Sequence, residues 1–239
     1  MSEIGIQQEE ELKVLKEKLR IAEEMNKKLL TENEQLKKSL NIIHQPEQLN
    51  FGEQHFKIIN ISPENARIDE VDGMQRKATN LNGWQCISLP VDLVITEGIY
   101  KIEFVFESNS DNDGRGVGIV SASHEIGYPC DPTDFDNRHK MLNYLGFNGQ
   151  ICYKSERTNG NACFQDDSHT IGLEIDMNQG NMHFFVDNTQ QPVYVRGIHE
   201  SVQFFGWLYF EGSSFIVKSL QRLAEPSSVI LEQEGIIEW

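Results

Sequence analysis

The sequence predicts a mainly β protein, an antiparallel β-sandwich preceded by a long helix that forms a coiled coil. From Phe51 onward, short stretches typical of strands recur about every ten residues, with turn dipeptides such as Asn82-Gly83 and Asn148-Gly149 between them. No helical pattern lies among these stretches, which is typical of a sandwich. Before His44, in contrast, leucines recur at the alternating short spacings of a coiled-coil heptad.

The clearest β signal lies between residues 166 and 188. Apolar residues alternate with others along 171–175 and again along 182–186. Side chains alternate between the two faces of a strand, so each run has one apolar face. The Asn-Gln-Gly sequence at 178–180 supplies a turn, because glycine adopts a positive φ without strain. We therefore expect a β-hairpin with one face in the core, Phe184 buried on that face, and a polar second face.

The other expected strands show similar alternation or are short apolar runs between turns. Tyr100, Ile102, Phe104 and Phe106, for example, share one face of a strand. The expected strands are 55–61, 66–71, 84–87, 99–107, 116–120, 143–147, 150–153, 169–176, 181–186, 192–195, 202–210 and 214–220.

Several of these motifs resemble those of the SPRY domain family. The IGLEID motif at 171–176 and the GNMHFFVDN motif at 180–188 resemble the family's signature hairpin, with Asp187-Asn188 where the family usually has Asn-Gly. The GVGIV motif at 116–120 resembles its glycine-valine strand, and YLGFNG at 144–149 resembles its tyrosine-glycine segment. The resemblance covers roughly residues 98–220. It implies a bent, concanavalin-like β-sandwich that binds other proteins through loops at one end.

Residues 9–43 carry an apolar heptad in which two seam positions are asparagine. Asn26 and Asn33 both fall at position a, where asparagine costs stability but specifies a parallel, two-stranded state. The flanking g and e′ pairs of such a dimer are opposite in charge or apolar, so none repels. The sequence therefore predicts self-association as a homodimer; the alternative is a helix that docks on its own domain. The predicted dimerisation residues are Leu12, Leu15, Leu19, Asn26, Leu29, Asn33, Leu36 and Leu40.

We expect five segments along the chain. They are a disordered start at 1–8, the parallel coiled coil at 9–43, a linker at 44–50, the SPRY-like sandwich at 51–223, and a C-terminal tail or last strand at 224–239. Pro46 ends the helix because proline cannot continue one. The resemblance is nearest to the SPRY part of SPRY domain–SOCS box proteins, but too few residues follow Leu220 for a SOCS box.

The composition excludes several classes of ligand. The chain has 239 residues and a net charge of −16, whereas nucleic acids and anionic membranes are bound by clustered Lys and Arg. No apolar run approaches the ~18 residues of a membrane span, and the N-terminus does not resemble a signal peptide, so we expect a cytoplasmic protein. The four cysteines form no C-x-x-C pair. We therefore expect no metal and no cofactor.

The loop at 121–141 is the first candidate for a binding surface, because loops longer than about 15 residues are usually functional or disordered. Gly127-Tyr128 resembles a position where a tyrosine lines the peptide pocket of SPRY domain–SOCS box proteins, while Glu211-Gly212 stands where those proteins have Trp-Gly. Acidic residues of the loop would favour a ligand with Lys or Arg. The alternative is a solvated acidic connection. The predicted partner-binding residues are Tyr128, Asp131, Asp134, Phe135, Arg138, Glu211 and Gly212.

The sequence thus predicts a non-enzymatic adaptor that binds a protein or peptide, with a basic ligand favoured. The Gly-x-Gly-x-Gly run at 114–118 enters a strand rather than a helix, which argues against a phosphate loop. No Gly-x-Ser-x-Gly motif is present. Two alternatives remain open: a carbohydrate-binding, lectin-like sandwich, and a hydrolase that uses Asp131, Asp134 and Asp136 as paired carboxylates.

Overall fold

A computed structural model describes residues 51–107 and 114–239, together with isolated helical positions near the N-terminus. The chain divides into two units, Met1–Leu49 and Asn50–Trp239. In the first unit, Arg20 pairs with Glu24 one helical turn later, at 2.8 Å. The predicted seam residues, the start at 1–8 and the linker at 44–50 lie outside the described residues, so the coiled coil stays a prediction. No described helix is long and apolar enough to span a bilayer.

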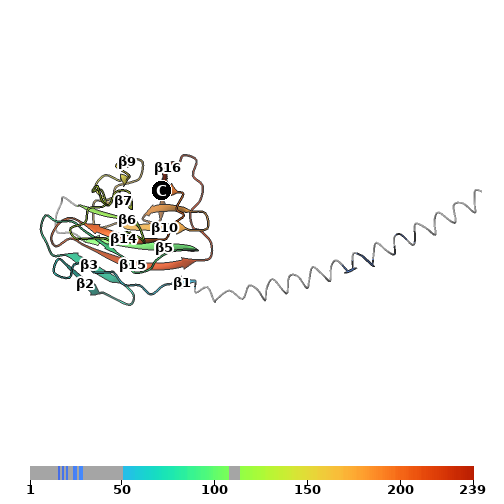
Figure 1. Cartoon of the computed structure of the whole chain (residues 1–239), viewed down its shortest axis with the longest axis horizontal. Helices are drawn as coiled ribbons and strands as arrows, with labels where there is room; N and C mark the ends of the chain where they lie inside the picture. Colours follow the sequence, from blue (N-terminus) through green and yellow to red (C-terminus); the bar gives the residue numbers. More distant parts are fainter. Residues whose placement is uncertain are drawn as a thin grey trace, which may run out of the picture. The chain divides into compact units, whose positions relative to one another are not determined.

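The second unit contains two sheets that face each other (Figure 1). The larger sheet has ten strands, in the order β16-β13-β11-β10-β5-β15-β3-β2, with β1 on β15 and β12 on β11. All of its pairs are antiparallel except β13 with β16. Its strands are β1 (Gly52–Glu53), β2 (Ala66–Glu70), β3 (Arg76–Asn80), β5 (Ile99–Glu107), β10 (Thr170–Asp176), β11 (Asn181–Val186), β12 (Thr189–Gln190), β13 (Val193–Arg196), β15 (Ser214–Leu223) and β16 (Gly235–Glu238).

The smaller sheet has six strands in the order β4-β14-β6-β7-β8-β9. They are β4 (Ile87–Pro90), β6 (Arg115–Ser121), β7 (Met141–Leu145), β8 (Ile151–Tyr153), β9 (Glu156–Thr158) and β14 (Val202–Leu208). The edge strand β16 of the larger sheet and the edge strand β9 of the smaller sheet lie on the same side of the unit (Figure 1). Residues of both strands line one groove. The predicted antiparallel sandwich is confirmed.

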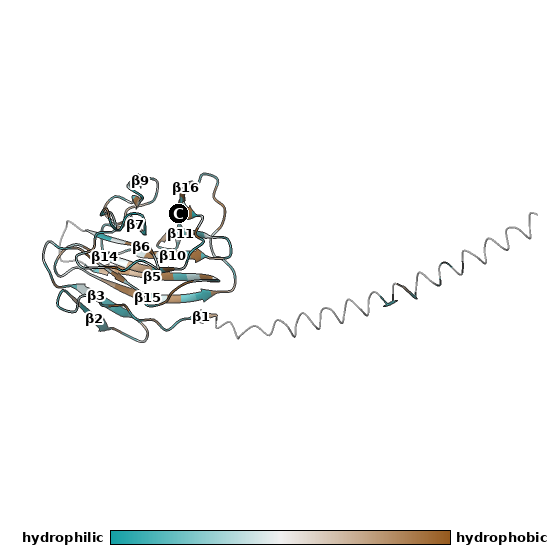
Figure 2. Ribbon diagram, viewed as in Figure 1, coloured by the Kyte–Doolittle hydropathy of each residue, from teal (hydrophilic) through white to brown (hydrophobic). Residues whose placement is uncertain are grey.

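The core lies between the two sheets and consists of the alternating inward side chains. Ile102 and Phe104 of β5 meet it from one sheet, and Ile119 of β6 and Tyr144 of β7 meet it from the other. All four are buried. In Figure 2 brown, apolar residues alternate with teal, polar ones along central strands such as β5, as expected where every second side chain enters the core.

The predicted hairpin is present as β10 and β11, with Leu173 opposite Phe184. Phe184 is fully buried, which confirms the predicted apolar face. Gly180 has a φ of 67°, and the Asp176 carboxylate accepts a hydrogen bond from the Asn178 amide at 2.8 Å, so the turn forms where the sequence indicates. On its other side β10 pairs with β5 along its whole length, and β11 pairs with β13. The hairpin therefore lies within the sheet rather than at its edge.

The second face of this hairpin differs from the expectation. Glu174 and His183 lie on the face that was predicted to be polar, yet both are buried, because residues 224–234 cross that face as a strap. The Glu174 carboxylate accepts hydrogen bonds from the Ser227 amide at 2.8 Å and the Ser228 amide at 2.9 Å. Gln190 pairs with the backbone of Val229 through both its amide oxygen and its amide nitrogen. Beyond the strap, the chain adds β16 to the sheet.

Some predicted strand positions are wrong. Residues 55–61 form only an isolated bridge, Ile58 with Val91, because this segment passes from the large sheet to the edge of the small one. The strand expected at 84–87 begins instead at Ile87, since a turn extends through Trp84. The strands β3 and β9 were not predicted; both are short and rich in polar residues, so they lack an apolar alternation.

Candidate partner-binding surface

The long loop between β6 and β7 is packed on the outer face of the six-stranded sheet. A second apolar cluster forms there from Cys130 of the loop and sheet residues such as Met141, Phe205 and Trp207. The Cys130 amide donates to the Cys86 carbonyl at 3.1 Å, which ties the loop to the residue before β4. The loop leaves β6 at one end of the sheet and reaches the other end at Cys86. It is therefore a structured cover rather than a solvated connection.

Tyr128 lies where this loop meets the turn that precedes β4. Its side chain is half-buried, and its hydroxyl accepts a hydrogen bond from Asn82 Nδ2 at 2.9 Å. The same Asn82 amide nitrogen also donates to Asn65 Oδ1 at 2.8 Å. The Tyr128 ring is thus fixed at its polar end, while Leu81, Trp84 and Gln85 of the turn are exposed. A rigid, half-buried tyrosine loses little conformational entropy on binding, as interface anchors require.

Asn80 organises the turn at 81–85 from beneath. Its side chain is fully buried, and Oδ1 accepts from the Asn82 amide at 3.0 Å. Its Nδ2 donates to the Gln85 carbonyl at 3.0 Å and to the Tyr209 carbonyl at 3.2 Å. One amide side chain therefore holds both ends of the 81–85 turn and joins them to the turn after β14.

Trp84 is presented outward by this turn. Its side chain is 78% exposed, and its φ is 64°, a left-handed conformation that bulky residues rarely adopt. Its ring forms a T-shaped contact with Phe210, with the ring centroids 5.9 Å apart, and Phe210 forms a similar contact with Tyr209 at 4.9 Å. Such strain persists only where surrounding contacts impose it, and it is typical of functional sites. Trp84 was missed by sequence reasoning, although a tryptophan directly after Asn-Gly was an available signal.

Glu211 and Gly212 lie on the other side of the same turn. The Gly212 amide donates to the Asn80 carbonyl at 2.8 Å, and Gly212 has a φ of 79°. The Glu211 carboxylate lies beside Gly83, where a Cβ atom would approach Oε2 to 3.2 Å. The structure thus brings three of the predicted residues, Tyr128, Glu211 and Gly212, to the flanks of one turn. We call the surface of Tyr128, Trp84, Tyr209, Phe210 and Glu211 the aromatic surface.

The remaining predicted residues lie farther along the loop, against the β8–β9 hairpin. Asp131, Asp134, Phe135 and Arg138 form a tight turn in which the Asp134 carbonyl accepts from the Arg138 amide at 2.9 Å. The Arg138 carbonyl accepts from the Lys154 amide at 2.8 Å, which fixes this turn to the hairpin. These residues therefore share a loop with Tyr128 but contact a different part of the sheet.

The three carboxylates considered for hydrolysis, Asp131, Asp134 and Asp136, all lie in this turn. Asp131 Oδ1 accepts from both the amide and the hydroxyl of Thr133 at 2.8 Å. Asp134 and Asp136 are exposed. Partial burial, followed by repulsion from Asp131 and Asp136, raises the pKa of Asp134. The three carboxylates share the surface of one loop, and Asp131 is engaged in holding its shape.

The cysteines near this loop are neutral thiols. Burial is the main cause that raises the pKa of Cys86 and of Cys130 to about 11, and burial also raises the pKa of Cys152. A thiol of that kind is a poor nucleophile at physiological pH. Within the described ranges, no group of three or more histidine, cysteine or carboxylate side chains is placed to hold a metal ion.

The sequence matches no protein-family model and no curated protein. Solved structures with a similar fold include the SPRY domain of human HERC1, which is 18% identical, covers 70% of this chain and 100% of that chain, and has a TM-score of 0.49. The PSpry domain of TRIM65 is 9% identical, with 69% and 89% covered and a TM-score of 0.49. The carbohydrate-binding module CBM66 from Bacillus subtilis is 10% identical, with 71% and 96% covered and a TM-score of 0.40.

Proposed function

We propose that this chain is a non-enzymatic interaction protein whose sandwich binds a protein or peptide through the aromatic surface. The observation that carries the proposal is Trp84, an exposed ring held at positive φ by the buried Asn80. Because the ring is exposed, it adds little to the stability of the core, and its strained backbone lowers the stability of the fold. Tryptophan, tyrosine and arginine dominate the binding energy of protein interfaces, so a fixed Trp84 beside Tyr128 fits a partner-binding role.

The charge around this surface favours a basic ligand. Glu211 lies at its edge, and the chain as a whole carries a net charge of −16. Complementary charges mainly accelerate association and weaken with added salt. A partner segment with an aromatic or aliphatic anchor next to Lys or Arg would match both features of the surface.

In the proposed assembly, the N-terminal heptads pair two chains in parallel, so that a cytoplasmic homodimeric adaptor carries two such surfaces. Two linked sites raise the apparent affinity for clustered or repeated partners without any new contact. This part of the proposal rests on the heptad pattern and on Asn26 and Asn33 at position a.

Truncation of Trp84 tests the proposal directly. Partners would be captured from a lysate with residues 51–239, and each would then be measured by surface plasmon resonance against Trp84→Ala and Tyr128→Ala variants. We expect each change to cost at least ~2 kcal/mol of binding, because both rings are anchors. Phe51→Ala is the matched control, since Phe51 is an exposed aromatic that precedes β1 on the larger sheet. Parent-like binding by both variants, with folding intact, would refute the proposal.

Carbohydrate binding is the second candidate, and Trp84 is also the observation that favours it, because sugar rings stack on exposed aromatic faces. The same variants separate the two candidates. Binding that simple sugars displace from the parent and that Trp84→Ala abolishes would indicate a lectin. Binding to a purified protein partner that excess sugar leaves unchanged would indicate the interaction module.

A further inference from the structure

Six of the eight arginines of this acidic chain form an ion pair with a carboxylate, and the other two line the same pocket. Those with a carboxylate partner at 4 Å or less are Arg20, Arg67, Arg76, Arg115, Arg196 and Arg222. Among the described residues, Arg138 and Arg157 form no ion pair. With 37 acidic residues against 21 basic ones, an unpaired arginine is unexpected here. Both of them line one pocket of about 190 Å³.

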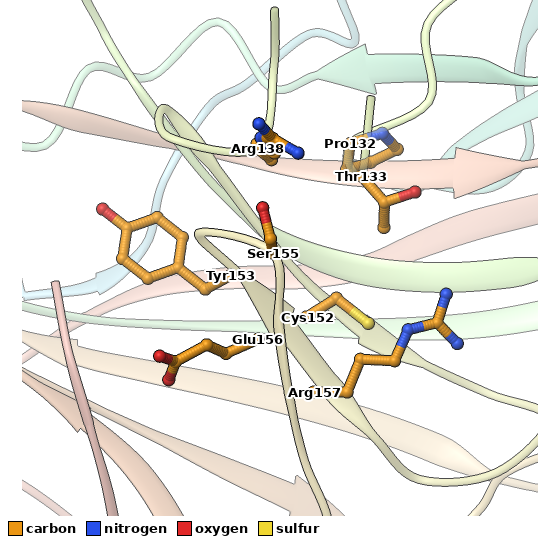
Figure 3. Close-up of a pocket in the computed structure, with 8 residues that line it drawn as sticks. All are labelled: Pro132, Thr133, Arg138, Cys152, Tyr153, Ser155, Glu156 and Arg157. Atoms are coloured by element: carbon orange, nitrogen blue, oxygen red, sulfur yellow. The ribbon is translucent and has the colours of Figure 1, made fainter. Parts of the chain in front are cut away.

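This pocket lies between the Asp131–Arg138 turn and the β8–β9 hairpin, away from the aromatic surface. Pro132 and Thr133 form one wall, and Cys152, Tyr153 and Ser155–Arg157 form the other. Figure 3 shows Arg138 and Arg157 on different sides of the cavity, with Ser155 and Cys152 between them and Thr133 to the right. The Glu156 carboxylate points to the side opposite the Arg157 guanidinium. We call this cavity the two-arginine pocket.

Arg138 is built into the pocket rather than free at the surface. Its guanidinium lies over the Phe135 ring at 4.7 Å, and its backbone carbonyl accepts from the Lys154 amide. Its Nε is buried and has no hydrogen-bond partner within the described part of the chain. A buried donor without a partner costs free energy, and it shows that the hydrogen-bonding capacity of this guanidinium is not used up by the described residues. Arg157 is exposed, so it lies at the mouth of the pocket, where a ligand can reach it.

We propose that the two-arginine pocket binds the phosphoryl group of a phosphorylated serine or threonine side chain. A phosphoryl group carries a charge of about −1.5 to −2 at neutral pH, which matches two guanidinium groups. It also offers three acceptor oxygens, so donors can approach from two walls, whereas a planar carboxylate suits a single arginine fork. The cavity is smaller than the roughly 300–1,000 Å³ of sites for drug-sized ligands, but side-chain-sized groups are smaller too.

The acidic residues near the pocket repel a bound anion, so the positive charges of both arginines are needed to hold it. Glu156 lines the same cavity, and Asp131 and Asp134 lie in the adjoining turn. Asp131 already uses its Oδ1 within that turn. Removing the charge of Glu156 should therefore strengthen binding of a phosphoryl group, while removing either guanidinium should weaken it.

The test is a titration of the ¹⁵N-labelled full chain with N-acetyl-O-phosphoserine amide, followed by NMR at the arginine Nε–Hε signals. We expect saturable shifts at Arg138 and Arg157. Arg138→Gln and Arg157→Gln should each weaken the affinity by about tenfold or more, because each removes a charge-assisted donor pair. Glu156→Gln should tighten it several-fold. Arg67→Gln, which removes an exposed and ion-paired arginine of β2, should leave it unchanged.

Three outcomes would overturn the proposal: no saturable shift at either arginine, parent-like affinity in Arg157→Gln, or equal affinity for N-acetylglutamate amide. Arg157 is exposed on a short edge strand, so its variant keeps the test valid even where Arg138→Gln fails to fold. Trp84→Ala should not affect this titration. Failure of the aromatic surface and failure of the two-arginine pocket are therefore distinguishable.

Discussion

Gly118 shows how a single residue sets the spacing of strands in this sandwich. It lies in β6 opposite Asn143 of β7, and a Cβ atom there would collide with the Leu142 carbonyl. The ring of Phe205 from β14 also lies within 3.0 Å of that position. Only glycine permits this approach of backbone and ring. The glycine-valine pattern that resembles a SPRY strand therefore has a packing cause in this chain.

Phe184 is a second residue whose contacts hold the two sheets together. Its side chain is fully buried, and its ring meets Tyr144 of the opposite sheet edge-on at 5.1 Å. Phe184→Ala leaves a cavity between the sheets, and we expect a loss of roughly 3–5 kcal/mol in the free energy of unfolding, measured by chemical denaturation. Phe147→Ala is the control, because Phe147 is 43% exposed and its loss should cost much less. A loss below ~1 kcal/mol for Phe184→Ala would contradict the assignment of the hairpin faces.

Among the elements, the strap at 224–234 changes the environment of the central hairpin. It covers the outer face of β10 and β11, and its backbone is held by the side chains of Glu174 and Gln190. Most of its residues are exposed, and Ile230 is 93% exposed. Its attachment therefore depends on hydrogen bonds to side chains of the sheet more than on apolar burial.

Glu174→Ala should release this strap while the sandwich stays folded. The change leaves the Ser227 and Ser228 amides without their acceptor, at a cost of about 1–3 kcal/mol. We expect faster hydrogen exchange at the amides of residues 227–229, with exchange in β5 unchanged. Glu232→Ala removes an exposed carboxylate of the strap itself and should have no such effect. Unchanged exchange at 227–229 in the Glu174 variant would mean that Glu174 does not hold the strap.

At the scale of the whole molecule, the C-terminal residues connect the two sheets. β16 extends the ten-stranded sheet in parallel with β13, and Trp239 then stacks on Tyr153 of the six-stranded sheet with ring centroids 4.8 Å apart. The Trp239 indole also donates to Glu200 at 3.0 Å. Residues 224–239 are therefore part of the folded unit, and binding experiments on the sandwich should retain them.

The heptads predict a dimer, which sedimentation can measure. The full chain, at 27.4 kDa per copy, should sediment as a dimer at micromolar concentration, and a chain that begins at Phe51 should sediment as a monomer. Asn26→Leu together with Asn33→Leu should raise the stability of the helix pair but broaden its oligomeric state, because buried asparagines select two parallel strands. A monomeric full-length chain would contradict the prediction.

Within the sandwich, the sequence alone determined those elements whose pattern is local. The strand Ile99–Glu107 and the strand Asn181–Val186 have the predicted bounds, because apolar residues recur at every second position within each strand and a glycine, Gly98 or Gly180, precedes it. The Gly180 turn was predictable for the same reason, since the need for positive φ is visible in the residue type. Tyr128, Glu211 and Gly212 could be proposed as neighbours only through the resemblance to SPRY domains.

The tertiary structure alone decided which side chains these local elements expose. Glu174 reads as a solvent-facing residue of an alternating strand, yet it is buried, because a segment about fifty positions later in the chain covers it. Trp84 was expected in a strand, yet it lies in a turn that faces outward, because Asn80 holds this turn and is itself bound to the carbonyl of the remote Tyr209. Arg138 and Arg157 are separated by two strands, and only the folded sheet brings them to one pocket. The local pattern of apolar residues predicts whether a segment forms a strand or a turn. Which of its side chains are buried, and which meet in one pocket, depends on segments that are remote in the sequence.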